Sequence, residues 1–150
     1  MGRMFALDAA VRYDVYLELA SGRRAPEVAA LAAATGGAPA DVRAALARLA
    51  AAHMLVLDGS GAVRMALPFS NVETAYAVEA GGSSFWANCA WDAIAIVRLL
   101  RLDEARVVDR GGRGRSARTL SVTRGSLVER DGVITIPLPA RRWWEDIVFT

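Results

Sequence analysis

The sequence contains no lysine, a single cysteine and a single histidine. One cysteine excludes a disulfide within the chain and any metal site built from several of its own thiolates. Apolar residues make up 54% of the chain, yet no apolar run approaches the roughly 18 residues of a membrane span. The start, Met1 to Ala10, does not resemble a signal peptide. We therefore expect a soluble cytoplasmic protein without a membrane partner.

Charge gives little indication of a binding partner. The 18 basic residues besides histidine are all arginine, and the net charge is only +2. Such a small excess is weak support for nucleic-acid binding. At 150 residues, the chain has the length of one domain or of two small lobes that share a core.

The amino-terminal part, residues 1–66, is expected to form a helical lobe that ends in a hairpin. A first helix is predicted from a cap at Asp8 to Ser21-Gly22, and a second from Pro26 to Gly36-Gly37. A third is predicted from Pro39 to His53, followed by two strands that flank an Asp58–Gly61 turn. This order resembles a winged helix-turn-helix, with Arg43 and Arg48 on the third helix. That helix is mostly alanine, which has no atoms to read base edges, so we favour a structural lobe over a DNA reader.

Residues 67–150 are expected to form an α+β lobe, with a small mixed or antiparallel sheet around a central helix. The predicted elements are a Pro68–Ser70 turn, a strand at 74–80, a loop at 81–84, a helix at 87–100 with Ala90, Ile94, Val97 and Leu100 inward, and strands at 105–108, 119–122, 127–129, 133–136 and from Trp143 onward. Between two of these strands, Arg110–Ser116 has the composition of an anion-binding loop. A solvated hairpin tip is the interpretation we favour for it.

Cys89 and Asp92 are the candidate catalytic residues. They are three positions apart, which places both on one face of the first helical turn. The helix dipole there favours a thiolate, so the sequence predicts a lowered pKa for Cys89. For Asp92 to act as an acid, nearby apolar side chains must oppose the same field by desolvation. Phe69, Trp86 and Trp91 are the residues expected to do so.

Three separated segments resemble the alkylmercury lyase family, also called organomercurial lyases. They are Met65-Ala66-x-Pro68-Phe69-Ser70 followed by Thr74, then Trp86-Ala87-Asn88-Cys89-Ala90-Trp91-Asp92-Ala93, and finally Trp143 to Thr150. The order of the three segments and the helical amino-terminal lobe both match this family. The resemblance implies that a carbon–mercury bond is cleaved by protonation, which yields a hydrocarbon and a mercuric ion.

The resemblance assigns Cys89 as the thiolate ligand of mercury and Asp92 as the proton donor. A thiolate suits this metal because both are soft. Phe69, Trp86, Asn88 and Trp91 are the expected pocket residues. No cofactor is required on this interpretation, and the partner is a small organomercurial or another small organic molecule. The oligomeric state stays open, a homodimer included.

The family uses a second active-site cysteine, expected shortly after the segment that ends at Thr150. A low-molecular-weight thiol, a second subunit or a longer natural chain would each account for this sulfur. Two alternatives stay open beside the mercury enzyme. One is an enzyme of the same fold diverted to a non-mercury, biosynthetic reaction that uses Asp92 for acid–base chemistry and the arginine-rich loop for an anion. The other is a winged-helix regulator or metal sensor.

Overall fold

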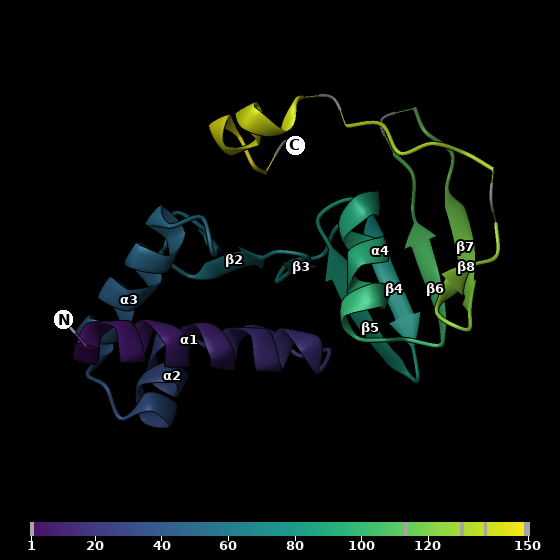
Figure 1. Ribbon diagram of the computed structural model, residues 1–150. Helices are drawn as coiled ribbons and strands as arrows, with labels where there is room; N and C mark the ends of the chain where they lie inside the picture. Colours follow the sequence, from purple (N-terminus) through teal and green to yellow (C-terminus); the bar gives the residue numbers. More distant parts are fainter. Residues whose placement is uncertain (1, 113, 130, 137, 149–150) are drawn as a thin grey trace.

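The computed structural model describes residues 2–112, 114–129, 131–136 and 138–148. Three helices at the amino end lie beside a sheet that carries a further helix on one face (Figure 1). The helices of the first lobe are α1 (Gly2–Ala20), α2 (Val28–Thr35) and α3 (Pro39–Ala51). Among the described residues, no helix is both long and apolar enough to cross a membrane.

The predicted ends of the amino-terminal helices are largely confirmed. Gly36 ends α2 with φ of 69°, a left-handed conformation that glycine adopts without strain. Pro39 lies in the first turn of α3, where its missing N–H has no helical partner to lose. The predicted Asp8 cap is wrong, because α1 begins at Gly2 and Asp8 lies inside it. Its carboxylate instead accepts two hydrogen bonds from Arg48 of α3, at 2.6 and 2.9 Å.

The strands form one antiparallel sheet in the order β1-β2-β3-β5-β4-β6-β7-β8. Their bounds are β1 (Val56–Leu57), β2 (Val63–Ala66), β3 (Phe69–Ser70), β4 (Tyr76–Ala80), β5 (Ser83–Ala87), β6 (Glu104–Asp109), β7 (Arg118–Thr123) and β8 (Ser126–Leu127). Helices followed by an antiparallel sheet confirm the predicted α+β class. The predicted division between residues 66 and 67 falls in the turn between the paired strands β2 and β3, so the sheet is continuous across it.

The turn predicted over Pro68–Ser70 is shorter than expected. Only Leu67 and Pro68 form it, joined by a cis peptide bond. Phe69 and Ser70 already belong to β3 and pair with Ala66 and Met65.

Helix α4 (Ala90–Leu99) packs on β4, β5 and β6 and begins three residues later than the sequence predicted. The reason is that β5 stays paired with β4 as far as Ala87, which pairs with Tyr76. The predicted inward face is confirmed at Val97 and differs elsewhere, since Ala93 and Ile96 are buried while Ala90 and Ile94 are only partly covered. The later start leaves Asn88 and Cys89 as the link between strand and helix.

The carboxyl-terminal segment contradicts the expected strands. Residues 133–136 pair with no other strand in the described structure, and the tryptophan pair lies in a 3-10 helix, η1 (Ala140–Glu145). The predicted last strand extended to Phe149 and Thr150, which lie outside the described residues. Pro137, and Arg113 in the basic loop, lie outside them as well. From β8 the segment returns toward the end of α3 (Figure 1).

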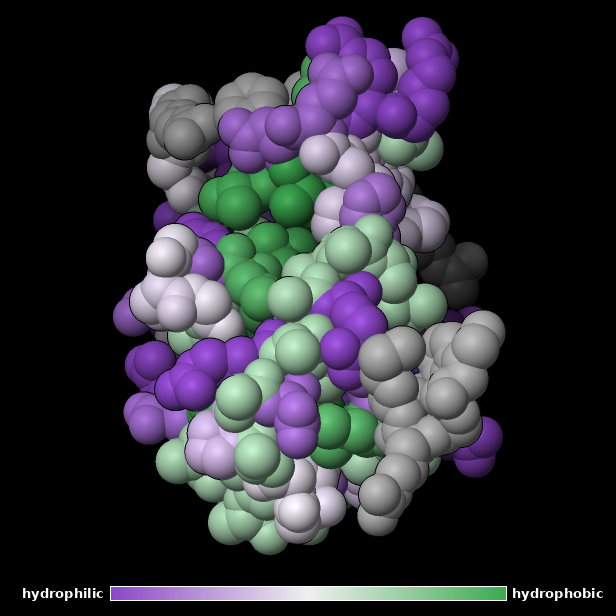
Figure 2. Space-filling model, turned by 90° about the vertical axis from the view of Figure 1, so that its left-hand side faces the viewer, coloured by the Kyte–Doolittle hydropathy of each residue, from purple (hydrophilic) through white to green (hydrophobic). Residues whose placement is uncertain are grey.

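Viewed from the helical end, hydrophobic residues gather in the upper middle of the surface, below a hydrophilic margin (Figure 2).

Candidate functional site

Cys89 and Asp92 meet at the amino end of α4. Cys89 is the N-cap residue with an extended backbone, and its Sγ accepts a hydrogen bond from the Asp92 backbone N–H at 3.4 Å. A cap satisfies one of the amides that the first helical turn leaves without a partner. Both side chains are half-buried. The strand-to-helix junction thus places a thiol beside a carboxyl group.

Asn88 lies between this carboxyl group and the sheet. Its Nδ2 donates to Asp92 Oδ2 at 3.2 Å and also approaches the main-chain oxygens of Pro68 and Phe69, at 3.3 and 3.4 Å. The Asn88 amide therefore ties the first turn of α4 to the turn before β3 and to β3 itself.

Burial dominates the acid–base properties of the pair. It raises the pKa of the Asp92 carboxyl above its ordinary value, against hydrogen bonds from Asn88 and Cys89 that lower it. Burial likewise raises the pKa of the Cys89 thiol, and the bond from the Asp92 N–H only partly opposes it. The predicted lowering of the Cys89 pKa is therefore wrong, because desolvation outweighs the field of the helix terminus. The two groups form a thiol beside an acid that holds its proton more strongly than usual.

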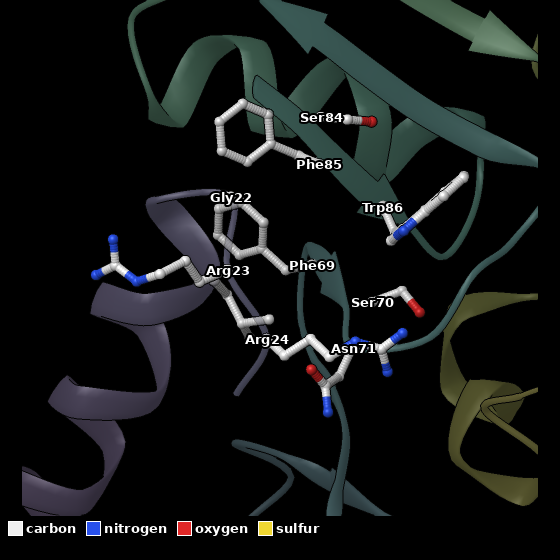
Figure 3. Close-up of a pocket in the computed structure, with 10 residues that line it drawn as sticks. Gly22, Arg23, Arg24, Phe69, Ser70, Asn71, Ser84, Phe85 and Trp86 are labelled. Carbon is white, nitrogen blue, oxygen red and sulfur yellow. The ribbon is translucent and has the colours of Figure 1, made fainter. Parts of the chain in front are cut away.

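A cavity of about 960 Å³ opens beside the pair. Of the predicted site residues, it is lined by Asn88, Cys89, Trp91 and Asp92. Phe69 and Trp86 line a different cavity of about 150 Å³, between the end of α1 and β5 (Figure 3). Phe69 is only 1% exposed and packs in the core. The Trp86 ring instead stacks against the guanidinium of Arg110, 4.5 Å away.

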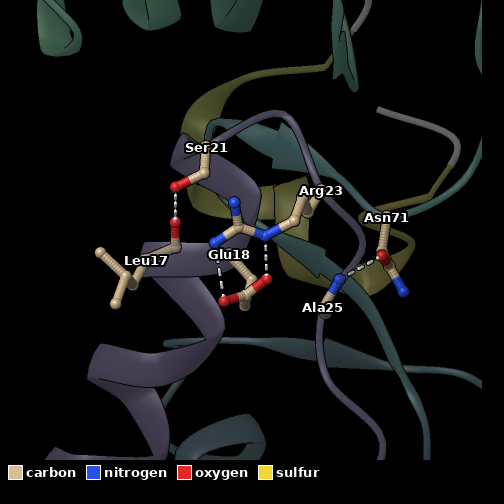
Figure 4. A network of polar contacts seen from close by, with 6 residues as sticks. All are labelled: Leu17, Glu18, Ser21, Arg23, Ala25 and Asn71. Carbon is tan, nitrogen blue, oxygen red and sulfur yellow. Dashed lines mark hydrogen bonds and ion pairs between the residues drawn. The ribbon is translucent and has the colours of Figure 1, made fainter.

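Hydrogen bonds beside the smaller cavity hold the end of α1 (Figure 4). Arg23 pairs with Glu18, and Ser21 Oγ donates to the Leu17 carbonyl at 2.7 Å. The Ala25 N–H donates to Asn71 Oδ1 at 2.8 Å, which joins the chain after α1 to the sheet. Of these contacts, the Ala25–Asn71 bond connects the two lobes, and neither residue lines the Cys89 cavity.

Much of the larger cavity is formed by residues that were not among the predicted pocket residues. Its far wall comes from the carboxyl-terminal segment, whose apolar members there are Val133, Ile134, Ile136, Trp143, Ile147 and Val148. The sequence predicted strands for these residues, and Trp143, Ile147 and Val148 belong to the third segment of the family resemblance. The path of the chain places all six beside the site. Tyr76 and Arg115 also line the cavity, and the Arg115 guanidinium lies 5.4 Å from the Tyr76 ring and 2.9 Å from Asp109 Oδ2.

Ligands for a resident metal ion are scarce. Within the described parts of the chain, no group of three or more histidine, cysteine, aspartate or glutamate residues is placed to hold one. Cys89 is the sulfur that the site offers. Of the two arginines considered for DNA contact, Arg48 is engaged by Asp8, whereas Arg43 is exposed.

Comparison with known proteins gives one family model and several solved structures, among them a mercury-bound protein. The crystal structure of the mercury-bound form of MerB2 superposes with a TM-score of 0.60 at 21% sequence identity, over 82% of this chain. The match covers 58% of that protein, so the present chain spans less than two thirds of its length. Curated proteins give no significant match. The family model of alkylmercury lyase matches residues 69–150, more than half of the sequence, and the chain therefore belongs to the alkylmercury lyase family.

Proposed function

We propose that this protein cleaves the carbon–mercury bond of a small organomercurial by protonolysis, with Cys89 as the mercury ligand and Asp92 as the proton donor. The observation that carries the proposal is the placement of a thiol and a pKa-raised carboxyl side by side in the wall of one cavity. Membership of the alkylmercury lyase family supports the reaction class.

The first step is the binding of mercury by Cys89. As mercury approaches, the Cys89 sulfur displaces the substrate's labile ligand, and the thiol proton leaves with that ligand. Binding of the sulfur to mercury offsets the raised pKa of the Cys89 thiol, and the raised pKa of Asp92 favours the protonated carboxyl group that the second step needs. The result is an organic group bound through mercury to Cys89, with a proton held on Asp92.

The second step breaks the bond. The electron pair of the carbon–mercury bond takes the proton from Asp92 and becomes a carbon–hydrogen bond, so the hydrocarbon leaves and mercuric ion stays on the Cys89 sulfur. This is general acid catalysis at carbon. A low-molecular-weight thiol entering the cavity then supplies a second sulfur and carries the ion away. No resident cofactor takes part.

A second candidate is acid–base chemistry on a non-mercury, anionic substrate. The observation in its favour is Arg115, which lines the same cavity as Asp92. Under this alternative, Cys89→Ser retains activity and Asp92→Asn loses it, whereas the mercury reaction needs both side chains.

The test is incubation of the protein with phenylmercury and excess thiol, with benzene measured by gas chromatography. We expect benzene from the unaltered protein, and none above background from Cys89→Ser or Asp92→Asn. Phenylmercury retained by the unaltered protein without release of benzene would reduce the site to a binding one.

A further inference from the structure

Asn88 holds a buried amide in an orientation that costs one hydrogen bond. Its Oδ1 has less than 1 Å² of accessible surface and no hydrogen-bond partner within the described structure. Most buried polar atoms in proteins are paired, so an unpaired one calls for a physical reason. The reason lies at the other end of the same amide group.

All three polar neighbours of Asn88 Nδ2 are acceptors, namely the Pro68 and Phe69 carbonyls and Asp92 Oδ2. If the amide were reversed, its oxygen would face these three oxygens. One unpaired Oδ1 costs less than that arrangement, because buried like-charged atoms repel strongly where water is excluded. The two main-chain carbonyls thus fix the amide so that a donor always faces Asp92.

We propose that Asn88 is a positioning residue that clamps Oδ2 of Asp92 and so directs the other carboxyl oxygen toward Cys89 and the substrate carbon. This inference rests on the proposed function and adds a role to it. The clamp is anchored on β3 rather than on α4, so the carboxyl group is held from two elements at once. Without it, Asp92 is free to rotate about its side-chain bonds while Cys89 stays on its helix cap.

The proposal predicts different effects on mercury capture and on proton transfer, and a single-turnover experiment measures the two events separately. Capture of mercury by Cys89 is followed through the near-ultraviolet absorbance of the sulfur–mercury bond, and proton transfer through hydrocarbon release. For Asn88→Leu and Asn88→Ala we expect capture within about twofold of the unaltered rate. Hydrocarbon release should slow by roughly 10- to 100-fold, the scale reported for small misplacements of a reacting group.

Asn71 provides the matched control. It too is partly buried after a short strand, and its amide bonds the Ala25 N–H at 2.8 Å and the Val63 carbonyl at 2.7 Å, with no contact to Asp92. Asn71→Ala should lower thermal stability while leaving the ratio of release to capture unchanged. Thermal melts of all variants identify any loss of fold.

Three outcomes overturn the inference: capture and release slow together in the Asn88 variants, neither changes, or Asn71→Ala shows the same selective loss of release. If the unaltered protein itself captures mercury and releases no hydrocarbon, the proposed function fails instead. The two failures are therefore told apart by the unaltered protein alone.

Discussion

The imidazole ring of His53 lies flat against the indole ring of Trp144, with centroids 3.9 Å apart and planes inclined by 6°. His53 follows α3, and Trp144 belongs to η1. The contact therefore joins the helical lobe to the segment that forms the far wall of the Cys89 cavity. The amino-terminal lobe thus supports the site without contributing a reacting group.

Breaking this ring stack should loosen the cavity wall. His53 has φ of 59°, so asparagine is the suitable replacement, because it tolerates the left-handed region. We expect His53→Asn to speed amide hydrogen exchange across 131–148 while α4 stays protected, and to cost about 0.5–1.5 kcal/mol of stability. Trp144→Phe keeps an aromatic ring and should show a smaller change. Equal exchange in His53→Asn and the unaltered protein would mean that the stack does not hold the segment.

Asp92 should lower the stability of the fold at neutral pH. Its folded-state pKa is raised above the ordinary value of 3.8, so the native state binds the proton more tightly than the unfolded chain. That stabilisation is complete below the ordinary value and is lost as the pH rises through the raised one. Asp92→Asn, which stays neutral, should therefore melt a few degrees higher than the unaltered protein near neutral pH. The difference should disappear at acidic pH.

Melting curves over a pH series test this sign. A variant that is less stable near neutral pH would show that the ionised carboxylate is favourably solvated in the native state. Asp92→Asn is also expected to release no hydrocarbon, so Asp92 would lower the stability of the fold while it supplies the activity.

Ile96 and Ile94 distinguish the face of α4 that packs on the sheet from the face that lines the cavity. Ile96 is fully buried against the sheet, so Ile96→Ala should cost about 2–5 kcal/mol by chemical denaturation. Ile94 is only partly covered and lines the cavity. Ile94→Ala should cost clearly less and should change the KM for bulky organomercurials. Equal losses at both positions would place the inward face of α4 elsewhere.

The sequence predicted the helical lobe well because its signals are local. Gly36 and Pro39 set helix ends through their own backbone preferences, and Val42, Leu46 and Leu49 recur at helical spacing and are buried. The start of α4 was missed because it depends on pairing between Ala87 and Tyr76, which no local pattern reveals.

The composition of the site was predicted in part. The proximity of Cys89 and Asp92 was predicted, although Cys89 lies at the N-cap with an extended backbone and not inside the first turn. Asn88 and Trp91 line the same cavity, as predicted. Trp86 is close to this pair in the sequence and Phe69 belongs to the preceding family segment, but β5 and β3 carry them to the smaller cavity. The pKa of Cys89 depends on burial by distant segments, so a dipole argument from the helix alone gave the wrong direction.

The origin of the hydrogen that replaces mercury tests the central claim most directly. In heavy water, the proposed reaction places one deuterium on the carbon that carried mercury, because Asp92 exchanges its proton with solvent before transferring it. We predict singly deuterated benzene from phenylmercury with the unaltered protein, detected by mass spectrometry, and none with Asp92→Asn although Cys89 still captures mercury. Benzene formed at an undiminished rate by Asp92→Asn would contradict the account.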